Sequence, residues 1–168
     1  MNGARTLYTI GYQGARLADF IAALQGAGVR MLVDVRFHPF SRRPEFRQGA
    51  LKEAIEAAGI GYTHLRQLGN PPPSRDAARA GDVETYHRLF QAHLDRFQAH
   101  LDRAETVAAL RQVIALDRAG PVALMCLERD PGDCHRLMVA ERAAAMSELR
   151  VAHLKPAGPL KDEEPLLL

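Results

Sequence analysis

Short apolar runs alternate with amphipathic segments along this 168-residue chain. Apolar or β-branched runs that stop at glycine or charged residues predict strands, and apolar residues repeating every three or four positions predict helices. The expected strands cover residues 6–10, 30–36, 62–65, 121–128 and 150–154. The expected helices cover residues 17–28, 50–58, 83–119 (with room for one break) and 134–146. This alternation favours an α/β fold, with an open, mostly parallel sheet of about five strands and helices on both faces.

The helical segment 83–119 contains a tandem heptad. Residues 90–96 read FQAHLDR, and residues 97–103 repeat the same seven letters. Because seven residues complete nearly two helical turns, the duplication keeps the apolar side chains on one face. His93 and His100 would then lie roughly 10.5 Å apart, too far to share a metal ion. We expect both histidines at the surface or at the edge of the apolar stripe.

Composition narrows the class of protein. An apolar content of 47% suits one globular domain, expected over residues 1–155. No apolar run approaches the roughly 18 residues that span a bilayer, and residues 1–9 lack the apolar stretch of a signal peptide. Two cysteines are too few for a secreted disulfide scaffold. We therefore expect a cytoplasmic protein without membrane contact, with a mobile loop at 70–82 and a frayed tail at 156–168.

Polar residues collect where the predicted strands end, which is where ligands bind in open α/β sheets. The four strand ends carry Gly11 and Tyr12, Asp34 and Arg36, His64 and Arg66, and Cys126 and Glu128. Asp34 lies inside an apolar run, so its carboxylate needs a partner, with Arg36 or a backbone donor the obvious candidates. A structural and a catalytic role for Asp34 both remain open.

The most basic segment of the chain is residues 36–47, with four arginines, one glutamate and three interleaved phenylalanines. Arginine suits forked recognition of phosphate, and aromatic rings beside it can stack on a base. We predict a phosphate-type anion site at this edge of the sheet. Its proposed members are Arg36, Arg42, Arg43, Arg136, Gly11, Tyr12 and His64. The alternative is a solvated loop whose phenylalanines anchor it to the core.

The triplet Cys134-His135-Arg136 follows the fourth strand. Asp130 with Pro131, or Asp133, is expected to cap a helix. Either cap places Cys134 in the first helical turn, where free N–H groups and the helix dipole favour a thiolate.

Several interpretations of this triplet stay open. Cys134 is a candidate nucleophile, activated by His135 or by the helix dipole. Cys126, Cys134 and His135 are candidate metal ligands, although the cysteines are not at a zinc-knuckle spacing and a fourth ligand must come from elsewhere. The helix end with Arg136 could instead hold an anion. A disulfide between the two cysteines would be unusual in the cytosol.

Two functional hypotheses follow. The first is a hydrolase or transferase acting on a phosphate-bearing substrate such as a nucleotide or nucleic acid, with Cys134 and His135 beside the acid/base candidates Asp34 and Glu128. The second is a nucleic-acid or anion-binding module without catalysis. No phosphatase-type cysteine loop or glycine-rich nucleotide fingerprint occurs in the chain. We assign no metal ligands, and neither cofactor nor oligomeric state follows from these residues.

Several motifs together carry a family resemblance. They are Thr9-Ile10-Gly11, Val33-Asp34-Val35-Arg36 with Pro39 and Ser41-Arg42-Arg43, Tyr62 with His64-Leu65 and Leu68-Gly69, and the run from Leu124 to Arg136 that contains Cys126, Glu128, Asp130-Pro131 and Cys134-His135. Over residues 6–154 the chain resembles the bacterial family called domain of unknown function 488. Members often have His-Ser after the first glycine, where this chain has Tyr12-Gln13. The resemblance implies a small cytosolic α/β domain and no established activity.

Overall fold

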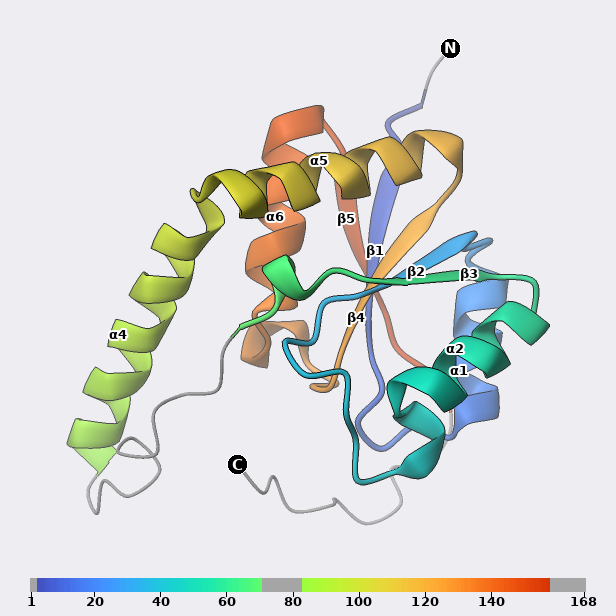
Figure 1. Cartoon of the computed structure of the whole chain (residues 1–168), viewed down its shortest axis with the longest axis horizontal. Helices are drawn as coiled ribbons and strands as arrows, with labels where there is room; N and C mark the ends of the chain where they lie inside the picture. Colours follow the sequence, from blue (N-terminus) through green and yellow to red (C-terminus); the bar gives the residue numbers. More distant parts are fainter. Residues whose placement is uncertain (1–2, 71–82, 158–168) are drawn as a thin grey trace.

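Five parallel strands form one sheet at the centre of the molecule (Figure 1). The computed structural model describes residues 3–70 and 83–157, so the loop at 71–82 and most of the predicted tail lie outside the described residues. The strands are β1 (Thr6–Gly11), β2 (Met31–Asp34), β3 (Gly61–His64), β4 (Val122–Cys126) and β5 (Arg150–Leu154), arranged in the order β3-β2-β4-β1-β5. The predicted open, parallel α/β sheet is confirmed.

Helices cover both faces of this sheet (Figure 1). Two of them, α1 (Leu17–Gly26) and α2 (Gln48–Ala57), pack on one face, while α4 (Val83–Leu101), α5 (Ala104–Ala119) and α6 (Arg136–Ser147) lie on the other. Alternate strand residues face opposite ways. Two separate apolar layers result, one under each group of helices.

The central strand β4 shows why the chain folds into this sheet. All five of its residues are buried, which is the pattern of a parallel strand covered on both sides. Leu124 packs in the layer under α5 and α6, whereas Ala123 and Met125 pack in the layer under α1 and α2. In contrast, the edge strand β5 exposes Arg150 and His153. Within the described residues, no helix is long and apolar enough to cross a bilayer.

The tandem heptad lies in α4 except for its last two residues, 102–103, where the predicted helical segment breaks before α5. Phe97 and Leu101 of the second copy are buried in the core, as the apolar stripe predicts. His100 is half-buried, and its Nε2 lies 2.8 Å from the carbonyl oxygen of Gln67. Of the two locations expected for His93, the surface is wrong and the edge of the apolar stripe remains, since the side chain is only 9% exposed. That burial lowers the pKa of His93, and the charges of Arg96 and His135 lower it further.

Gly11 permits a close approach between the end of β1 and the loop after β4. A Cβ atom at this position would lie 1.8 Å from the carbonyl oxygen of Glu128. The loop after β4 is also hydrogen-bonded to this turn, since the backbone N–H of Gln13 donates to the carbonyl of Leu127 at 2.8 Å. Gly11, predicted as part of an anion site, therefore has a packing role that accounts for glycine there.

We expect Gly11→Ala to lower the free energy of unfolding by about 2 kcal/mol or more, because backbone atoms would have to move to admit the methyl group. Gly49→Ala is the matched control, since Gly49 lies in α2 with open space around the added carbon. It should stabilise the protein by up to about 1 kcal/mol through helix propensity. Urea denaturation measures both, and equal stabilities of the two variants would contradict the packing role.

Candidate functional site

The carboxyl ends of four strands meet in register. Gly11 of β1 pairs with Cys126 of β4, and Asp34 of β2 lies between Met125 of β4 and His64 of β3. The prediction that the polar strand ends share one edge of the sheet is confirmed. This edge is where an open α/β sheet offers a ligand site.

The side chains at this edge separate into two groups on opposite faces of the sheet. Asp34 follows Leu32 by two residues and shares its face, under α1 and α2. Cys126 belongs instead to the layer under α5 and α6, together with Cys134. The sequence-predicted site is thus divided into a charged group on the first face and a thiol–imidazole group on the second.

Asp34 and Arg36 form a buried, two-pronged ion pair at the centre of the charged group. Nε of Arg36 donates to Oδ1 of Asp34 at 2.9 Å, and Nη2 donates to Oδ2 at 2.7 Å. The side chains are 0% and 5% exposed. Burial lowers the pKa of Arg36, but the hydrogen bond and charge of Asp34 outweigh it and raise that pKa above its ordinary value. The partner predicted for Asp34 is confirmed.

The remaining donors of Arg36 hold the basic loop in place. Nη1 donates to the carbonyl of Phe46 at 2.8 Å and, at 3.4 Å, to the carbonyl of Phe40 and the hydroxyl of Tyr12. Tyr12 is itself buried and stacks on the Phe46 ring, with 4.5 Å between centroids. Arg36 therefore ties the end of β2 to both ends of the loop, and its donors are occupied within the protein.

Two residues of β3 complete the charged group. The hydroxyl of Tyr62 donates to Oδ2 of Asp34 at 2.5 Å, and burial together with the charge of Asp34 raises the pKa of Tyr62 above its usual range. Nε2 of His64 lies 2.6 Å from the carbonyl oxygen of Arg36. Sequence reasoning did not assign Tyr62 to the site. Its position two residues before His64, on the same face of a strand, is the signal that could have found it.

Arg136 braces the loop between β4 and α6. It is fully buried, and its Nη1 and Nη2 donate to the carbonyls of Glu128 and Arg129 at 2.5 and 3.2 Å. Its Nε has no partner among the described residues. Like Arg36, Arg136 uses its guanidinium to hold backbone carbonyls within the protein.

The expected position of Cys134 in the first turn of a helix is wrong. A separate 3-10 turn, η3, covers Pro131–Asp133, and Asp130 caps it by accepting from the N–H of Gly132 at 2.9 Å. Cys134 follows in an extended conformation, and α6 begins only at Arg136. Asp130 therefore caps the 3-10 turn that begins at Pro131, and it does not cap α6. Because Cys134 lies outside α6, the dipole of that helix no longer accounts for a stabilised Cys134 thiolate.

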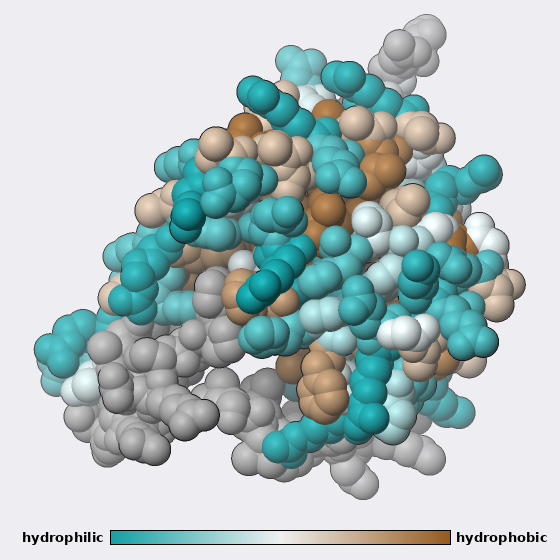
Figure 2. Space-filling view, in the orientation of Figure 1, coloured by the Kyte–Doolittle hydropathy of each residue, from teal (hydrophilic) through white to brown (hydrophobic). Residues whose placement is uncertain are grey.

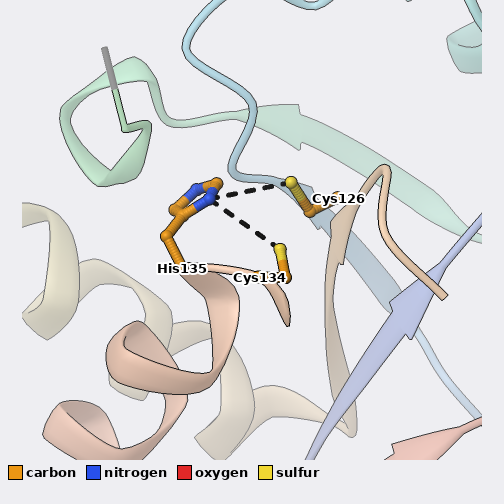
Figure 3. A group of neighbouring side chains, drawn as sticks. All are labelled: Cys126, Cys134 and His135. Carbon is orange, nitrogen blue, oxygen red and sulfur yellow. Dashed lines mark hydrogen bonds between the residues drawn. The ribbon is translucent and has the colours of Figure 1, made fainter. Parts of the chain in front are cut away.

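The side chains of Cys126, Cys134 and His135 converge on one another (Figure 3). Nδ1 of His135 lies 3.8 Å from each of the two sulfur atoms. Nε2 of the same ring lies 2.9 Å from the carbonyl oxygen of Val35, and the Phe97 ring of α4 packs edge-on against it. Burial raises the pKa of the Cys134 thiol, and Cys126 adds to the rise. Burial lowers the pKa of His135, but Cys134 and the Val35 carbonyl raise it overall.

Glu128, two residues beyond Cys126, lies near this thiol–imidazole group. Its charge contributes to the raised pKa of His135. One of its carboxylate oxygens, Oε2, is buried and has no hydrogen-bond partner among the described residues. A buried carboxylate oxygen without a donor is costly unless a proton or a cation meets it. Glu128 is therefore more available for chemistry than Asp34, whose oxygens are fully engaged.

Comparison with known proteins gives a family and nothing further. A family described as "Domain of unknown function DUF488" matches residues 16–143, which is more than half of the chain. No curated protein matched, and no solved structure matched.

We expect Asp34→Asn to lower the free energy of unfolding by about 3–5 kcal/mol, because it leaves the buried Arg36 charge without its partner. Glu45→Gln is the control: it breaks the half-exposed pair with Arg43 and should cost below about 1 kcal/mol. Denaturant titration measures both. A loss of under about 1 kcal/mol for Asp34→Asn would refute the buried ion pair.

The raised pKa of Cys134 predicts that its thiol is alkylated slowly. With a chelator present, alkylation of Cys134 in the folded chain at pH 7 should be slower than in the same chain unfolded in denaturant, where the pKa lies near 8.5. The rate should rise as the pH is raised, because more of the thiolate forms. Peptide mass spectrometry follows the labelling. Equal or faster alkylation in the folded chain would instead support an activated nucleophile.

Proposed function

The chain belongs to the DUF488 family, whose description records no activity, and we propose from its geometry that it binds phosphate-bearing ligands, single-stranded nucleic acid above all, through the basic loop. The observation that carries this proposal is Phe40. It is 62% exposed, the most exposed large apolar side chain among the described residues. Figure 2 shows one face of the molecule, on which hydrophilic residues predominate and apolar residues are interspersed. An aromatic ring open to solvent can stack on a base.

Arginines surround this ring on its own loop. The guanidinium of Arg47 lies over the Phe40 ring, 5.1 Å from its centroid, and both side chains are exposed. Arg42 is exposed and makes no hydrogen bond or ion pair within the described part of the chain. Exposed guanidinium groups beside an aromatic ring combine phosphate attraction with base stacking, which is the usual chemistry of single-strand binding.

Two further arginines extend the surface. Arg66, just after β3, is exposed and lies over the Phe37 ring at 4.3 Å. Arg43 pairs with Glu45 and also donates to the carbonyl of Tyr12 at 3.4 Å, so it contributes less free charge. We call Phe37, Phe40, Arg42, Arg47 and Arg66 the arginine–aromatic surface. The buried Asp34–Arg36 pair supports it from below by holding the Phe40 and Phe46 carbonyls.

A second candidate function is hydrolysis or group transfer at phosphate, centred on the thiol–imidazole group rather than on the arginine–aromatic surface. The buried, unpartnered oxygen of Glu128 favours it, because a desolvated carboxylate is a suitable general acid or base. Glu128 would act beside Cys134 and His135, while Asp34 serves as a structural residue. Turnover of a nucleotide or oligonucleotide that is lost in Glu128→Gln supports this candidate. A steep salt dependence of binding with no turnover supports the binding module alone.

A cytoplasmic location belongs to the same proposal, because a reducing compartment keeps both thiols free.

We expect Arg42→Ala and Arg47→Ala to weaken binding of a labelled single-stranded oligonucleotide and to reduce the slope of log K against log salt by about 0.7 each. Phe40→Ala should cost about 1–3 kcal/mol of binding with little change in that slope, since it removes stacking and no charge. Fluorescence anisotropy at several salt concentrations measures both quantities.

Arg111→Ala is the matched control for this experiment, because Arg111 is an exposed arginine on α5, away from the basic loop. Its affinity and salt slope should equal those of the parent chain. If Arg111→Ala weakens binding as much as Arg42→Ala does, binding follows overall charge and the proposed surface is incorrect.

A further inference from the structure

We propose that Cys126, Cys134 and His135 bind a thiophilic divalent cation, zinc in the first place, through two thiolate sulfurs and Nδ1 of the imidazole. The proposal does not depend on nucleic-acid binding, because none of the three ligands belongs to the arginine–aromatic surface. The three ligand atoms lie within 4.8 Å of one another although the residues come from the end of β4 and from the two positions just before α6 (Figure 3).

The observed spacing is close to that of a tetrahedral zinc site. Zinc–sulfur bonds of about 2.3 Å and zinc–nitrogen bonds of about 2.0–2.1 Å place sulfur and nitrogen roughly 3.6 Å apart. Both Nδ1–Sγ distances are 3.8 Å. The two sulfurs, which lie within 4.8 Å of each other, would approach to roughly 3.8 Å around a tetrahedral ion. Thiolate and imidazole together select zinc and similar soft or borderline ions over magnesium and calcium.

The orientation of His135 supports a ligand role. A carbonyl oxygen can only accept, so the 2.9 Å contact with Val35 places the proton on Nε2. In the neutral ring, Nδ1 then presents its lone pair to both sulfurs. Metal-binding histidines generally have this arrangement, with the second nitrogen donating to a carbonyl or carboxylate.

The backbone also prepares Cys134 for the ion. The N–H of Arg136 points at its sulfur at 3.5 Å, and the N–H of Cys134 donates to the carbonyl of Pro131 at 3.2 Å. An N–H aimed at sulfur favours the deprotonated ligand. Binding would displace two thiol protons to solvent and leave the site with two thiolates, one neutral imidazole and the divalent ion.

Glu128 provides an independent observation that points to a cation. Its buried Oε2 has no partner within the described residues, and Glu128 follows the ligand Cys126 by two residues. A cation beside this carboxylate would offset its desolvation. Among the described residues the ligand group has three members, so the fourth coordination position is left for water or another small ligand. Three protein ligands with an open position are typical of catalytic zinc sites.

The test uses the full chain, purified without chelators and analysed for metal by mass spectrometry. We expect about one equivalent of zinc. After removal of the metal, titration with Co²⁺ should produce thiolate-to-cobalt charge transfer and the visible bands of a tetrahedral ion. Less than about a tenth of an equivalent of zinc, with no such spectrum on adding Co²⁺, would overturn the proposal.

Variants locate the ion. Cys134→Ser and His135→Gln should each weaken Co²⁺ binding at least about tenfold, whereas His100→Gln, on a half-buried histidine outside the group, should leave it unchanged. Nucleic-acid binding should persist in all three, which separates failure of this proposal from failure of the previous one. Glu128→Gln should weaken Co²⁺ binding several-fold without altering the charge-transfer band.

Because both cysteines are buried and serine variants could misfold, a second measurement uses the unaltered chain. Zinc should protect both thiols of the native protein from a thiol reagent, and a chelator should restore their reaction. Reaction at the same rate with and without zinc would contradict the site. So would a Cys126–Cys134 disulfide in freshly purified protein, since it removes both thiolates.

Discussion

The arrangement of this molecule's polar residues depends on one buried ion pair, between Asp34 and Arg36 at the end of β2. A carboxylate with no exposed surface is tolerable only with a full set of donors, and Asp34 obtains them from Arg36 and Tyr62. The same guanidinium then holds two carbonyls of the basic loop. The guanidinium of Arg36, which the sequence suggests as a ligand for an anion, is therefore used within the protein. By holding the basic loop, it presents other arginines to solvent.

The sheet divides the chemistry of its carboxyl edge between two faces. On one face the ion pair organises a loop with exposed arginines and an exposed phenylalanine, which suits a polyanion. On the other face two thiols and an imidazole converge, which suits a soft cation. The faces are connected at the end of β2, because His135 contacts the carbonyl of Val35 and His64 contacts that of Arg36. Both groups therefore contact the same short backbone segment at the end of β2.

Most of the fold was predictable from local patterns, because buried parallel strands and amphipathic helices leave periodic signatures. The Asp34–Arg36 pair was predictable as well, since a carboxylate inside an apolar run demands a donor. Two features were not. Cys134 precedes α6 because Pro131 and Gly132 form their own 3-10 turn, and a capping signal cannot distinguish such a turn from the helix that follows. The burial of His93 depends on long-range packing, which sequence spacing does not encode.

Amide hydrogen exchange in Asp34→Asn tests most directly whether the ion pair organises the arginine–aromatic surface. Under conditions where the variant remains folded, the account predicts faster exchange at the backbone N–H groups of Phe46 and Gln48, which are bonded within the loop, with unchanged protection in α5. Unchanged exchange in the loop, in a variant shown to have lost the Arg36 pairing, would contradict it. So would a uniform loss of protection across the whole sheet, because that result would make the pair a general stabiliser rather than the support of this one surface.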